Sequence, residues 1–174
     1  MERDDFHGEP AALGKRQSGS DFREFFEAEY PRLAKALFLI VGDPLEADEL
    51  AQEALVRVFE RWDRVHLMDS PVGYLYRTAL NLNRSRLRRL ASRAKHALSP
   101  SSGPDPLAGV EARDEVRRLL AALPRGQREA VVLVEWLGVG AEQAGVILGI
   151  DASTARVQLS RARRALRTRV EQDE

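Results

Sequence analysis

Residues 140–170 read GAEQAGVILGIDASTARVQLSRARRALRTRV, and this pattern predicts a helix-turn-helix. Ala144 and Gly145 make the first helix small enough for another helix to approach closely. Gly149 fits the turn, because glycine adopts a positive φ without steric cost. Either Asp151 or Ser153 can cap the second helix. Apolar residues then recur at helical spacing and predict its buried stripe: Ala155, Leu159, Ala162 and Leu166.

The other faces of this second helix are cationic. No acidic side chain occurs between residues 152 and 170, whereas arginine is frequent there. A helix that is apolar on one side and hydrogen-bonding and cationic on the other is typical of DNA-reading helices. A plain amphipathic surface helix would account for the arginines, but not for the short helix and glycine turn before them. We therefore predict that this segment binds DNA.

The composition restricts the other functions that the chain can have. The 174 residues suffice for one ordinary domain or two small ones, and 44% are hydrophobic. The lack of cysteine excludes a disulfide framework, a thiolate metal site and a cysteine nucleophile, and it fits a reducing compartment. No apolar run approaches the roughly 20 residues of a membrane span, and the N-terminus does not resemble a secretory signal. The three histidines are scattered and no glycine-rich phosphate loop occurs, so we expect no enzyme activity, metal or cofactor.

Charge is segregated along the chain, although the formal net charge is zero. Acids outnumber bases between residues 21 and 63. Residues 70–104 contain seven basic side chains and no acid, and residues 152–170 are basic again. This distribution suggests two DNA-facing surfaces and one surface for a different partner.

Helical periodicity dominates the chain and predicts an all-α fold without strands. We expect a disordered tail at 1–19 and a first domain, a three-helix bundle, at 20–95, with helices near 45–62 and 71–95. Residues 96–110 are rich in proline, glycine and serine, which predicts a flexible linker. A second helical domain with breaks at 123–124 and 138–140 follows at 111–170, and 171–174 form a tail. The prediction is two small helical domains on a flexible tether.

The first domain carries an acidic helix followed by an aromatic and basic one. The segment ADELAQEALVRVFERW at 47–62 has an apolar stripe with acids and amides on its other faces, and alone it could be only a solvated helix of a bundle. Tyr74, Tyr76 and Arg77 then lie next to a loop, with asparagines and arginines beyond them. Aromatic rings can stack on unpaired bases and arginines can hold phosphates, so the pattern favours single-stranded or melting DNA. Each tyrosine could equally be a core residue.

Three segments, taken in order, resemble those of bacterial extracytoplasmic-function sigma factors, the two-domain class of RNA polymerase specificity subunit. GDPLEADELAQEALVRVFERW at 42–62 resembles the helix that binds the polymerase clamp, and SPVGYLYRTALNLNRSRLRR at 70–89 resembles the promoter-melting helix. LPRGQREAVVLVEWLGVGAEQAGVILGIDASTARVQLSRARRALR at 123–167 resembles the fourth region with its helix-turn-helix. The chain looks closest to the short actinobacterial type. It departs from the family pattern at the reversed acid pair Asp48-Glu49, at Tyr74 in place of a frequent tryptophan, and at Gln158 in place of a common arginine.

The resemblance implies that the chain binds core RNA polymerase, recognises the minus-ten and minus-thirty-five promoter elements and initiates transcription. Its implied partners are promoter DNA and the beta-prime clamp helices and beta flap of the polymerase. The implied location is the cytoplasm, at the nucleoid, without membrane binding. Whether an anti-sigma factor is a further partner stays open.

The implied sites form three sets of residues. Core polymerase would contact the acidic helix at Asp48, Glu49, Gln52, Glu53, Arg57 and Phe59. The opened minus-ten element would be held at His66, Ser70, Tyr74, Tyr76, Arg77, Asn81, Asn83, Arg84 and Arg88. The minus-thirty-five element would be read at Ser153, Thr154, Arg156, Val157, Ser160 and Arg161, with Arg163 and Arg164 on phosphates.

Two other functions fit parts of the sequence. A stand-alone helix-turn-helix regulator that binds duplex DNA as a dimer would use the C-terminal domain. It would need a sensing or dimerising N-terminal domain, which the arginine- and tyrosine-rich helix fits poorly. A helical protein held on RNA or on the nucleoid by charge alone is the other alternative. Co-purification with core polymerase separates a sigma factor from both.

Overall fold

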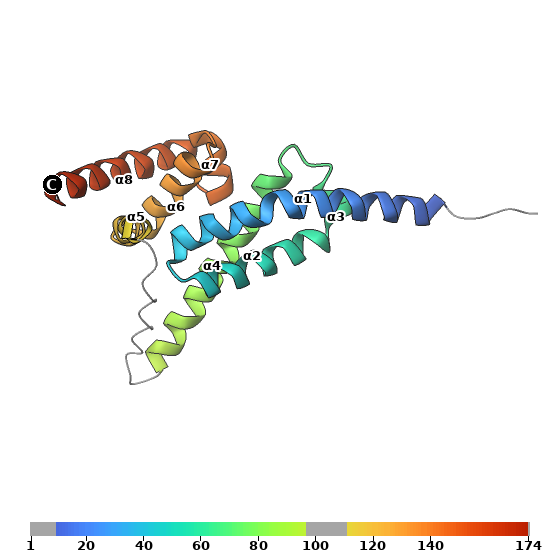
Figure 1. Ribbon diagram of the computed structural model, residues 1–174, viewed down its shortest axis with the longest axis horizontal. Helices are drawn as coiled ribbons and strands as arrows, with labels where there is room; N and C mark the ends of the chain where they lie inside the picture. Colours follow the sequence, from blue (N-terminus) through green and yellow to red (C-terminus); the bar gives the residue numbers. More distant parts are fainter. Residues whose placement is uncertain (1–9, 97–110, 174) are drawn as a thin grey trace, which may run out of the picture.

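Helices form every regular element in the described part of the computed structural model, which covers residues 10–96 and 111–173. The N-terminal block consists of α1 (Pro10–Val41), α2 (Pro44–Phe59), α3 (Trp62–Val65) and α4 (Pro71–His96). The C-terminal block consists of α5 (Glu111–Ala121), α6 (Arg125–Val131), the short π-helical segment η1 (Val132–Trp136), α7 (Ala141–Leu148) and α8 (Ala152–Asp173). The all-α prediction is therefore confirmed for the described residues (Figure 1).

A sharp corner joins α1 to α2 and lets the two helices pack side by side. Gly42 follows α1 with a φ of 88°, in the left-handed region that glycine tolerates. The Asp43 carboxylate then accepts a 2.8 Å hydrogen bond from the backbone N–H of Glu46, and Pro44 occupies the first turn of α2. Buried side chains of α1, α2 and α4 form the core of this block, among them Leu33, Leu37, Leu50, Leu55, Val58, Leu75 and Leu80.

Trp62 lies outside α2, contrary to the predicted helix at 45–62. The helix ends at Phe59, and Arg61 leaves helical geometry with φ −123° and ψ 14°. The short helix α3 begins at Trp62, whose buried ring centroid lies 5.3 Å from that of Phe22 and 4.9 Å from that of Phe25. Packing of this ring against α1 thus overrides the helical periodicity of the sequence.

The predicted tails and linker differ in part from the structure. α1 begins at Pro10, so residues 10–19 are helical where we expected disorder, and residues 1–9 lie outside the described residues. α4 includes His96, the first residue of the predicted linker, and the remainder at 97–110 also lies outside them. α8 continues to Asp173 instead of ending near residue 170. A helix that packing has already nucleated adds further turns at low cost, which explains these extensions.

The C-terminal block contains the predicted helix-turn-helix. Gly149 follows α7 in the left-handed conformation, with φ 69° and ψ 36°. The backbone N–H of Ile150 donates a 3.0 Å hydrogen bond to the carbonyl of Gly145, which closes the turn before α8. Both predicted breaks also fall between helices, one between α5 and α6 and the other between η1 and α7. α8 packs against α6 and α7, and the buried residues of these three helices include Ala130, Ile147, Leu148, Leu159 and Ala162.

Replacing Gly145 with alanine is expected to destabilise this turn. A Cβ atom at this position would lie 2.9 Å from the carbonyl oxygen of Ile150 and 3.3 Å from the backbone nitrogen of Ala152. Because both are backbone atoms, the turn itself must shift, and we expect a loss of about 1–3 kcal/mol in the free energy of unfolding, measured by urea titration. Gly126→Ala is the matched control, since its Cβ would meet only the Gln158 side chain at 3.5 Å. Equal losses in the two variants would contradict the prediction.

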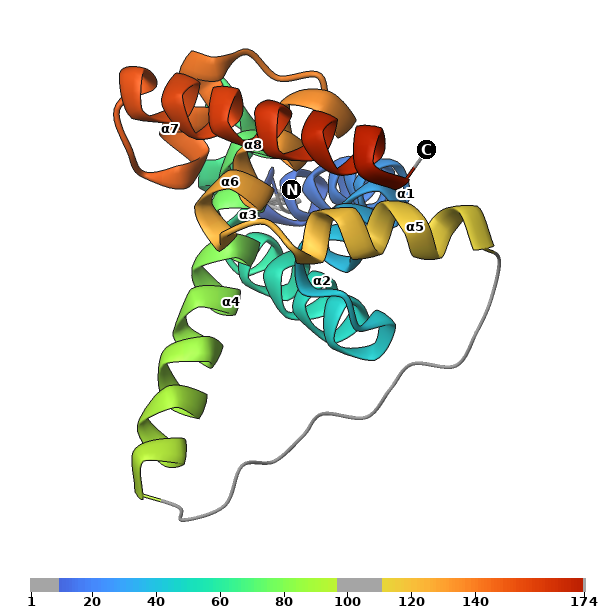
Figure 2. The same ribbon diagram turned by 90° about the vertical axis from the view of Figure 1, so that its left-hand side faces the viewer.

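The two blocks lie against each other (Figure 2), whereas the sequence predicted two domains held only by a tether. Arg128 of α6 donates a 2.7 Å hydrogen bond to the carbonyl of Ile40 in α1. The Lys35 ammonium of α1 lies 4.2 Å from the ring centroid of Trp136. The C-terminal half of α4 projects away from both blocks. The hydrogen bond from Arg128 to Ile40 and the contact of Lys35 with Trp136 join residues that are far apart in the sequence, so no local sequence pattern predicts them.

Candidate nucleic-acid interface

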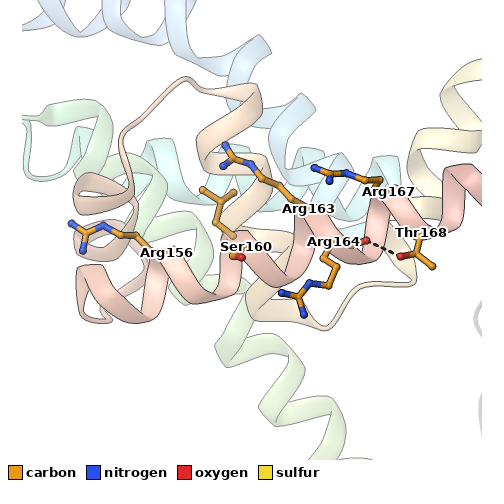
Figure 3. Close-up of a pocket in the computed structure, with 7 residues that line it drawn as sticks. Arg156, Ser160, Arg163, Arg164, Arg167 and Thr168 are labelled. Carbon is orange, nitrogen blue, oxygen red and sulfur yellow. Dashed lines mark hydrogen bonds between the residues drawn. The ribbon is translucent and has the colours of Figure 1, made fainter.

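Arginine and hydroxyl side chains line the outward face of α8 (Figure 3). Ala155, Leu159 and Ala162 are buried, which leaves the remaining faces of the helix to solvent. A helix with a buried apolar stripe and an exposed hydrogen-bonding face can enter a major groove. All eight residues that we predicted for duplex binding are exposed here: Ser153, Thr154, Arg156, Val157, Ser160, Arg161, Arg163 and Arg164.

The arginines on this face differ in whether the protein itself holds them. Arg156 donates to Glu142 at 3.2 Å, and Arg163 donates to one carboxylate oxygen of Glu135 at 2.6 and 2.8 Å. Exposed ion pairs contribute only about 0–1 kcal/mol, so a DNA phosphate can replace either acid. Among the residues that the structure describes, three arginines of the face have no side-chain partner: Arg161, Arg164 and Arg167.

α4 and the loop before it carry the residues predicted for opened DNA, and their exposure varies. The exposed members of this set are His66, Arg77, Asn81 and Arg88. Ser70, Tyr74 and Arg84 are partly buried. Tyr76 and Asn83 are buried. The exposed members can therefore contact nucleic acid in this conformation, whereas the others are restricted by their neighbours.

α2 presents acids and amides on its outward face. Glu49, Gln52 and Glu53 are exposed. Asp48 is partly buried and accepts hydrogen bonds from the hydroxyl of Tyr30 and, at 2.8 Å, from the amide nitrogen of Gln52. The bond to Asp48 raises the pKa of Tyr30. This face is thus a preformed anionic surface, unlike the cationic surfaces of α4 and α8.

An apolar groove of about 530 Å³ runs between α1 and α2, beside these acids. Val56 and Phe59 are 56% and 57% exposed there, and with the walls of the groove they form a contiguous apolar patch, which is a common mark of an interaction surface. Phe22, Phe26 and Tyr30 line the opposite wall, and the ring centroids of Phe22 and Phe59 lie 4.8 Å apart. Of the residues that line this groove, the sequence-based site prediction included Gln52 and Phe59 and omitted the others. The spacing of Phe22, Phe26 and Tyr30 by four residues was the available signal, but the same spacing also fits a core stripe.

Both blocks match known protein families, and each match covers one block. Residues 25–93 match Sigma-70 region 2, and residues 113–166 match Sigma-70, region 4. The RNA polymerase sigma-E factor of Streptomyces avermitilis is 30% identical to this chain over 153 residues, which cover 87% of this chain and 86% of that protein. The chain belongs to the sigma-70 family.

Further relatives place this sigma factor in the extracytoplasmic-function class. The ECF RNA polymerase sigma factor EcfG of Rhodopseudomonas palustris is 30% identical over 149 residues, covering 83% of this chain and 82% of that protein. The fold is similar to that of the sigma factor RpoE of Bartonella quintana in complex with the anti-sigma factor NepR, with a TM-score of 0.72, 23% identity and coverage of 88% and 99%. It is also similar to CnrH in complex with the cytosolic domain of CnrY, with a TM-score of 0.66, 23% identity and coverage of 91% and 96%. This chain is therefore a sigma factor that acts in promoter recognition and transcription initiation.

Tyr76 and Asn83 of the sigma factor do not fit their predicted contacts with opened DNA in this structure. Tyr76 is only 2% exposed, its hydroxyl has no hydrogen-bond partner, and burial raises its pKa. Asn83 is 3% exposed. Tyr74, by contrast, is partly accessible and its hydroxyl accepts a 3.1 Å hydrogen bond from Arg61. The sequence left open whether each tyrosine is a core residue, and packing decides this for Tyr76.

The outer part of α4 carries further cations that the site prediction omitted. Arg89 and Arg93 are exposed on its projecting half. Arg86 bridges α4 to α2, because its guanidinium lies 3.1 Å from Glu46 and 3.2 Å from Glu49. The acid-free run at 70–104 contained the signal for these residues, which add to the cationic surface of the sigma factor.

Among the side chains that the structure describes, no group of three histidine, cysteine or acidic residues is placed to hold a metal ion. Within residues 10–96 and 111–173, no helix has both the length and the apolar character needed to cross a membrane.

Proposed function

We propose that three surfaces of the sigma factor divide the work of promoter recognition. α2 and the apolar groove bind the beta-prime clamp helices of core polymerase. α4 and its preceding loop hold the opened minus-ten element. α8 reads the minus-thirty-five element, and the C-terminal block contacts the beta flap. The observation that carries this proposal is the separation of exposed charge, with acids on α2 and unpaired arginines on α8. Each surface suits a different partner, since acids repel DNA phosphates and arginines attract them.

The clamp contact combines the acids with the groove. Glu49 and Glu53 are exposed and suit a basic partner helix, and Arg57 pairs with Glu53 at 2.7 Å. Val56 and Phe59 would bury their apolar surface against the same partner. Apolar side chains at the centre with charges around them are the usual composition of a protein interface.

The minus-ten contact uses the exposed face of α4 and the loop at 66–70. Asn81 is exposed and can hydrogen-bond a base edge or the backbone at the upstream edge of the opened DNA, while Arg77 and Arg88 hold phosphates. The loop offers His66 and Ser70 to an extruded base. Extrusion of a base costs a few kcal/mol, which such contacts must offset.

The minus-thirty-five contact places the N-terminal half of α8 in the major groove. Side chains there approach base edges, which assigns readout to residues from Ser153 to Arg161. Arg163 and Arg164, one turn further along, meet phosphates, and Arg167 lies further out.

Arg161→Ala is expected to change which base is preferred at one promoter position, whereas Arg164→Ala should weaken all sequences alike. The two arginines are a matched pair, since each is exposed and neither has a side-chain partner among the described residues. An arginine bidentate to guanine contributes about 1–3 kcal/mol of discrimination. A phosphate contact instead lowers the slope of log affinity against log salt by about 1.

A selection from a promoter library at two salt concentrations measures both effects. If Arg161→Ala keeps the wild-type base preference while Arg164→Ala alters it, α8 lies in the groove in the opposite direction. If neither variant changes preference or salt dependence, α8 is not the reading helix.

Sigma factors are not enzymes, and we propose that this member has no catalytic activity of its own. We also propose that it acts in the cytoplasm, where polymerase works on the nucleoid.

The similar structure of RpoE contains the anti-sigma factor NepR. If an anti-sigma factor also binds this chain, the groove between α1 and α2 is the surface where it would compete with polymerase.

A further inference from the structure

Arg61 lies at the junction between α2 and α3, beside the first turn of α4. Its backbone leaves helical geometry there, and its side chain is exposed. One guanidinium nitrogen donates a 3.1 Å hydrogen bond to the hydroxyl of Tyr74 in α4, and this bond raises the pKa of Arg61. The fold therefore brings Arg61 to the surface predicted for opened DNA, although the sequence-based site prediction omitted it.

The contact with Tyr74 does not neutralise the charge of Arg61. The hydroxyl is a neutral partner, and Glu60 next to Arg61 in the chain has only a weaker effect on the pKa of Arg61. Arg57, one helical turn earlier, differs because the carboxylate of Glu53 holds it at 2.7 Å. A guanidinium has five N–H donors, and the hydroxyl accepts only one of them. Arg61 can therefore keep its bond to Tyr74 and still bind a phosphate.

The hydroxyl of Tyr74 is what allows this arrangement. Tyr74 stands where a tryptophan is frequent in the family. An indole N–H only donates hydrogen bonds, as a guanidinium does, so a tryptophan could not accept one from Arg61. The departure from the family pattern thus gives this chain a hydrogen bond that the more frequent residue cannot form.

Two further features place Arg61 beside the expected path of the opened strand. The loop at 66–70 follows α3 directly, so Arg61 lies close to its start along the chain. Arg77 comes three residues after Tyr74, which puts both on one face of α4, and it is exposed. Tyr74 is thus an aromatic residue between two exposed cations. Surfaces that bind single strands combine aromatic rings for the bases with cations for the phosphates.

We propose that Arg61 is a further phosphate-binding residue of the minus-ten surface, and that Tyr74 is the positioning residue that holds its guanidinium toward the opened strand. The inference rests on the proposed role of α4 and its preceding loop. Arg61 supplies the electrostatic contact. The bond to Tyr74 restricts the long arginine side chain before DNA arrives, which reduces the conformational entropy lost on binding.

The test uses holoenzyme assembled from core polymerase and the full chain. Its probe is a promoter obtained from the library selection described above, prepared as a full duplex and with the minus-ten element already unpaired. Binding of both probes is measured over a range of salt concentrations, and core binding is titrated separately. The variants are Arg61→Met, Arg61→Lys, Tyr74→Phe and the combination of Arg61→Met with Tyr74→Phe. Arg23→Met is the matched control, since Arg23 is an exposed arginine of α1 outside the proposed surfaces.

We expect Arg61→Met to weaken binding of the unpaired promoter by about ten-fold, the size of one charge-assisted contact. The slope of log affinity against log salt should fall by about 0.7, as for one phosphate of a single strand. Arg61→Lys should keep the wild-type slope because it keeps the charge. Tyr74→Phe should weaken binding by about two- to five-fold. The combined variant should be no weaker than Arg61→Met, since the hydroxyl acts through Arg61.

A merely structural bond between α3 and α4 would leave the salt slope unchanged, and that result for Arg61→Met overturns the inference. Additive losses in the combined variant remove Tyr74 as the positioning residue. Loss of core binding by Arg61→Met would place Arg61 on polymerase and overturn the inference as well.

The two probes distinguish this inference from the proposed function. If wild-type holoenzyme holds the unpaired promoter no more tightly than the duplex, the proposed role of α4 fails together with the inference. If wild type prefers the unpaired promoter while Arg61→Met behaves like Arg23→Met, the role of α4 stands and only Arg61 is removed from the minus-ten surface.

Discussion

Reversal of charge at Glu49 and Glu53 to lysine is expected to weaken binding of the sigma factor to core RNA polymerase by roughly 100-fold, because like charges brought together across an interface cost several kcal/mol. Both carboxylates lie on the exposed face of α2 beside the apolar groove. Their present partners, Arg86 and Arg57, make exposed pairs of small energy, so the fold should tolerate the change. Titration of labelled protein with core enzyme measures the loss.

The control for this experiment carries the same change in net charge elsewhere. Glu115→Lys with Glu171→Lys alters two exposed acids of the C-terminal block and should leave core binding close to wild type. A further variant, Val56→Gln, tests the groove without changing charge, and it should weaken binding because Val56 is 56% exposed and would be buried only in the complex. Core binding by the charge-reversed protein equal to that of its control would remove α2 from the interface.

Arg128→Met should produce the largest loss of stability, about 3–5 kcal/mol in the free energy of unfolding of the C-terminal block. One guanidinium here donates to three carbonyls, those of Ile40 at 2.7 Å and of Ala121 and Leu123 at 3.0 Å. Ala121 is the last residue of α5 and Leu123 lies in the turn before α6, so the arginine satisfies carbonyls of this corner that have no helical partner. Burial lowers the pKa of Arg128.

Arg125→Met is the matched comparison, since Arg125 lies on the same helix but is half exposed and makes a longer ion pair of 3.6 Å with Glu129. It should cost less than about 1 kcal/mol. Arg128→Lys should recover only part of the loss, because one ammonium cannot reproduce the planar fork of a guanidinium. Urea unfolding followed by circular dichroism decides between these outcomes. If Arg128→Met and Arg125→Met lose equal stability, Arg128 does not hold the α5–α6 corner.

The parts of the fold that depend on local chemistry could be predicted from the sequence. Gly149 at the left-handed turn, Pro44 and Pro71 at the starts of helices, and the small residues of α7 each specify a backbone geometry within a few residues. The exposure of the α8 arginines follows from the same periodicity, since the apolar stripe determines which faces remain outside. These predictions concern one helix at a time.

Features that depend on contacts distant in sequence could not be predicted in the same way. The burial of Tyr76 is decided by which side of α4 faces the other helices of its block, and an aromatic next to an apolar residue fits either side. Arg84 and Glu129 form a hydrogen bond although they are 45 residues apart, and the sequence around neither residue indicates the other as its partner. The groove between α1 and α2 arises only when the two helices pack, because Phe22 and Val56 come from different helices.

The π-helical segment η1 determines where the chain can tolerate a change of length. Its widened turn is marked by the backbone N–H of Leu137, which bonds to the carbonyl of Val132 five residues earlier. A turn of this kind holds one residue more than an α-helical turn. Deletion of one residue from Val132–Trp136 would therefore let the segment relax into a regular α-helix while α7 and α8 keep their register. The Trp136 ring would then lose its contact with the Lys35 ammonium, which is one of the contacts between the two blocks. The DNA-reading helix α8 would be retained.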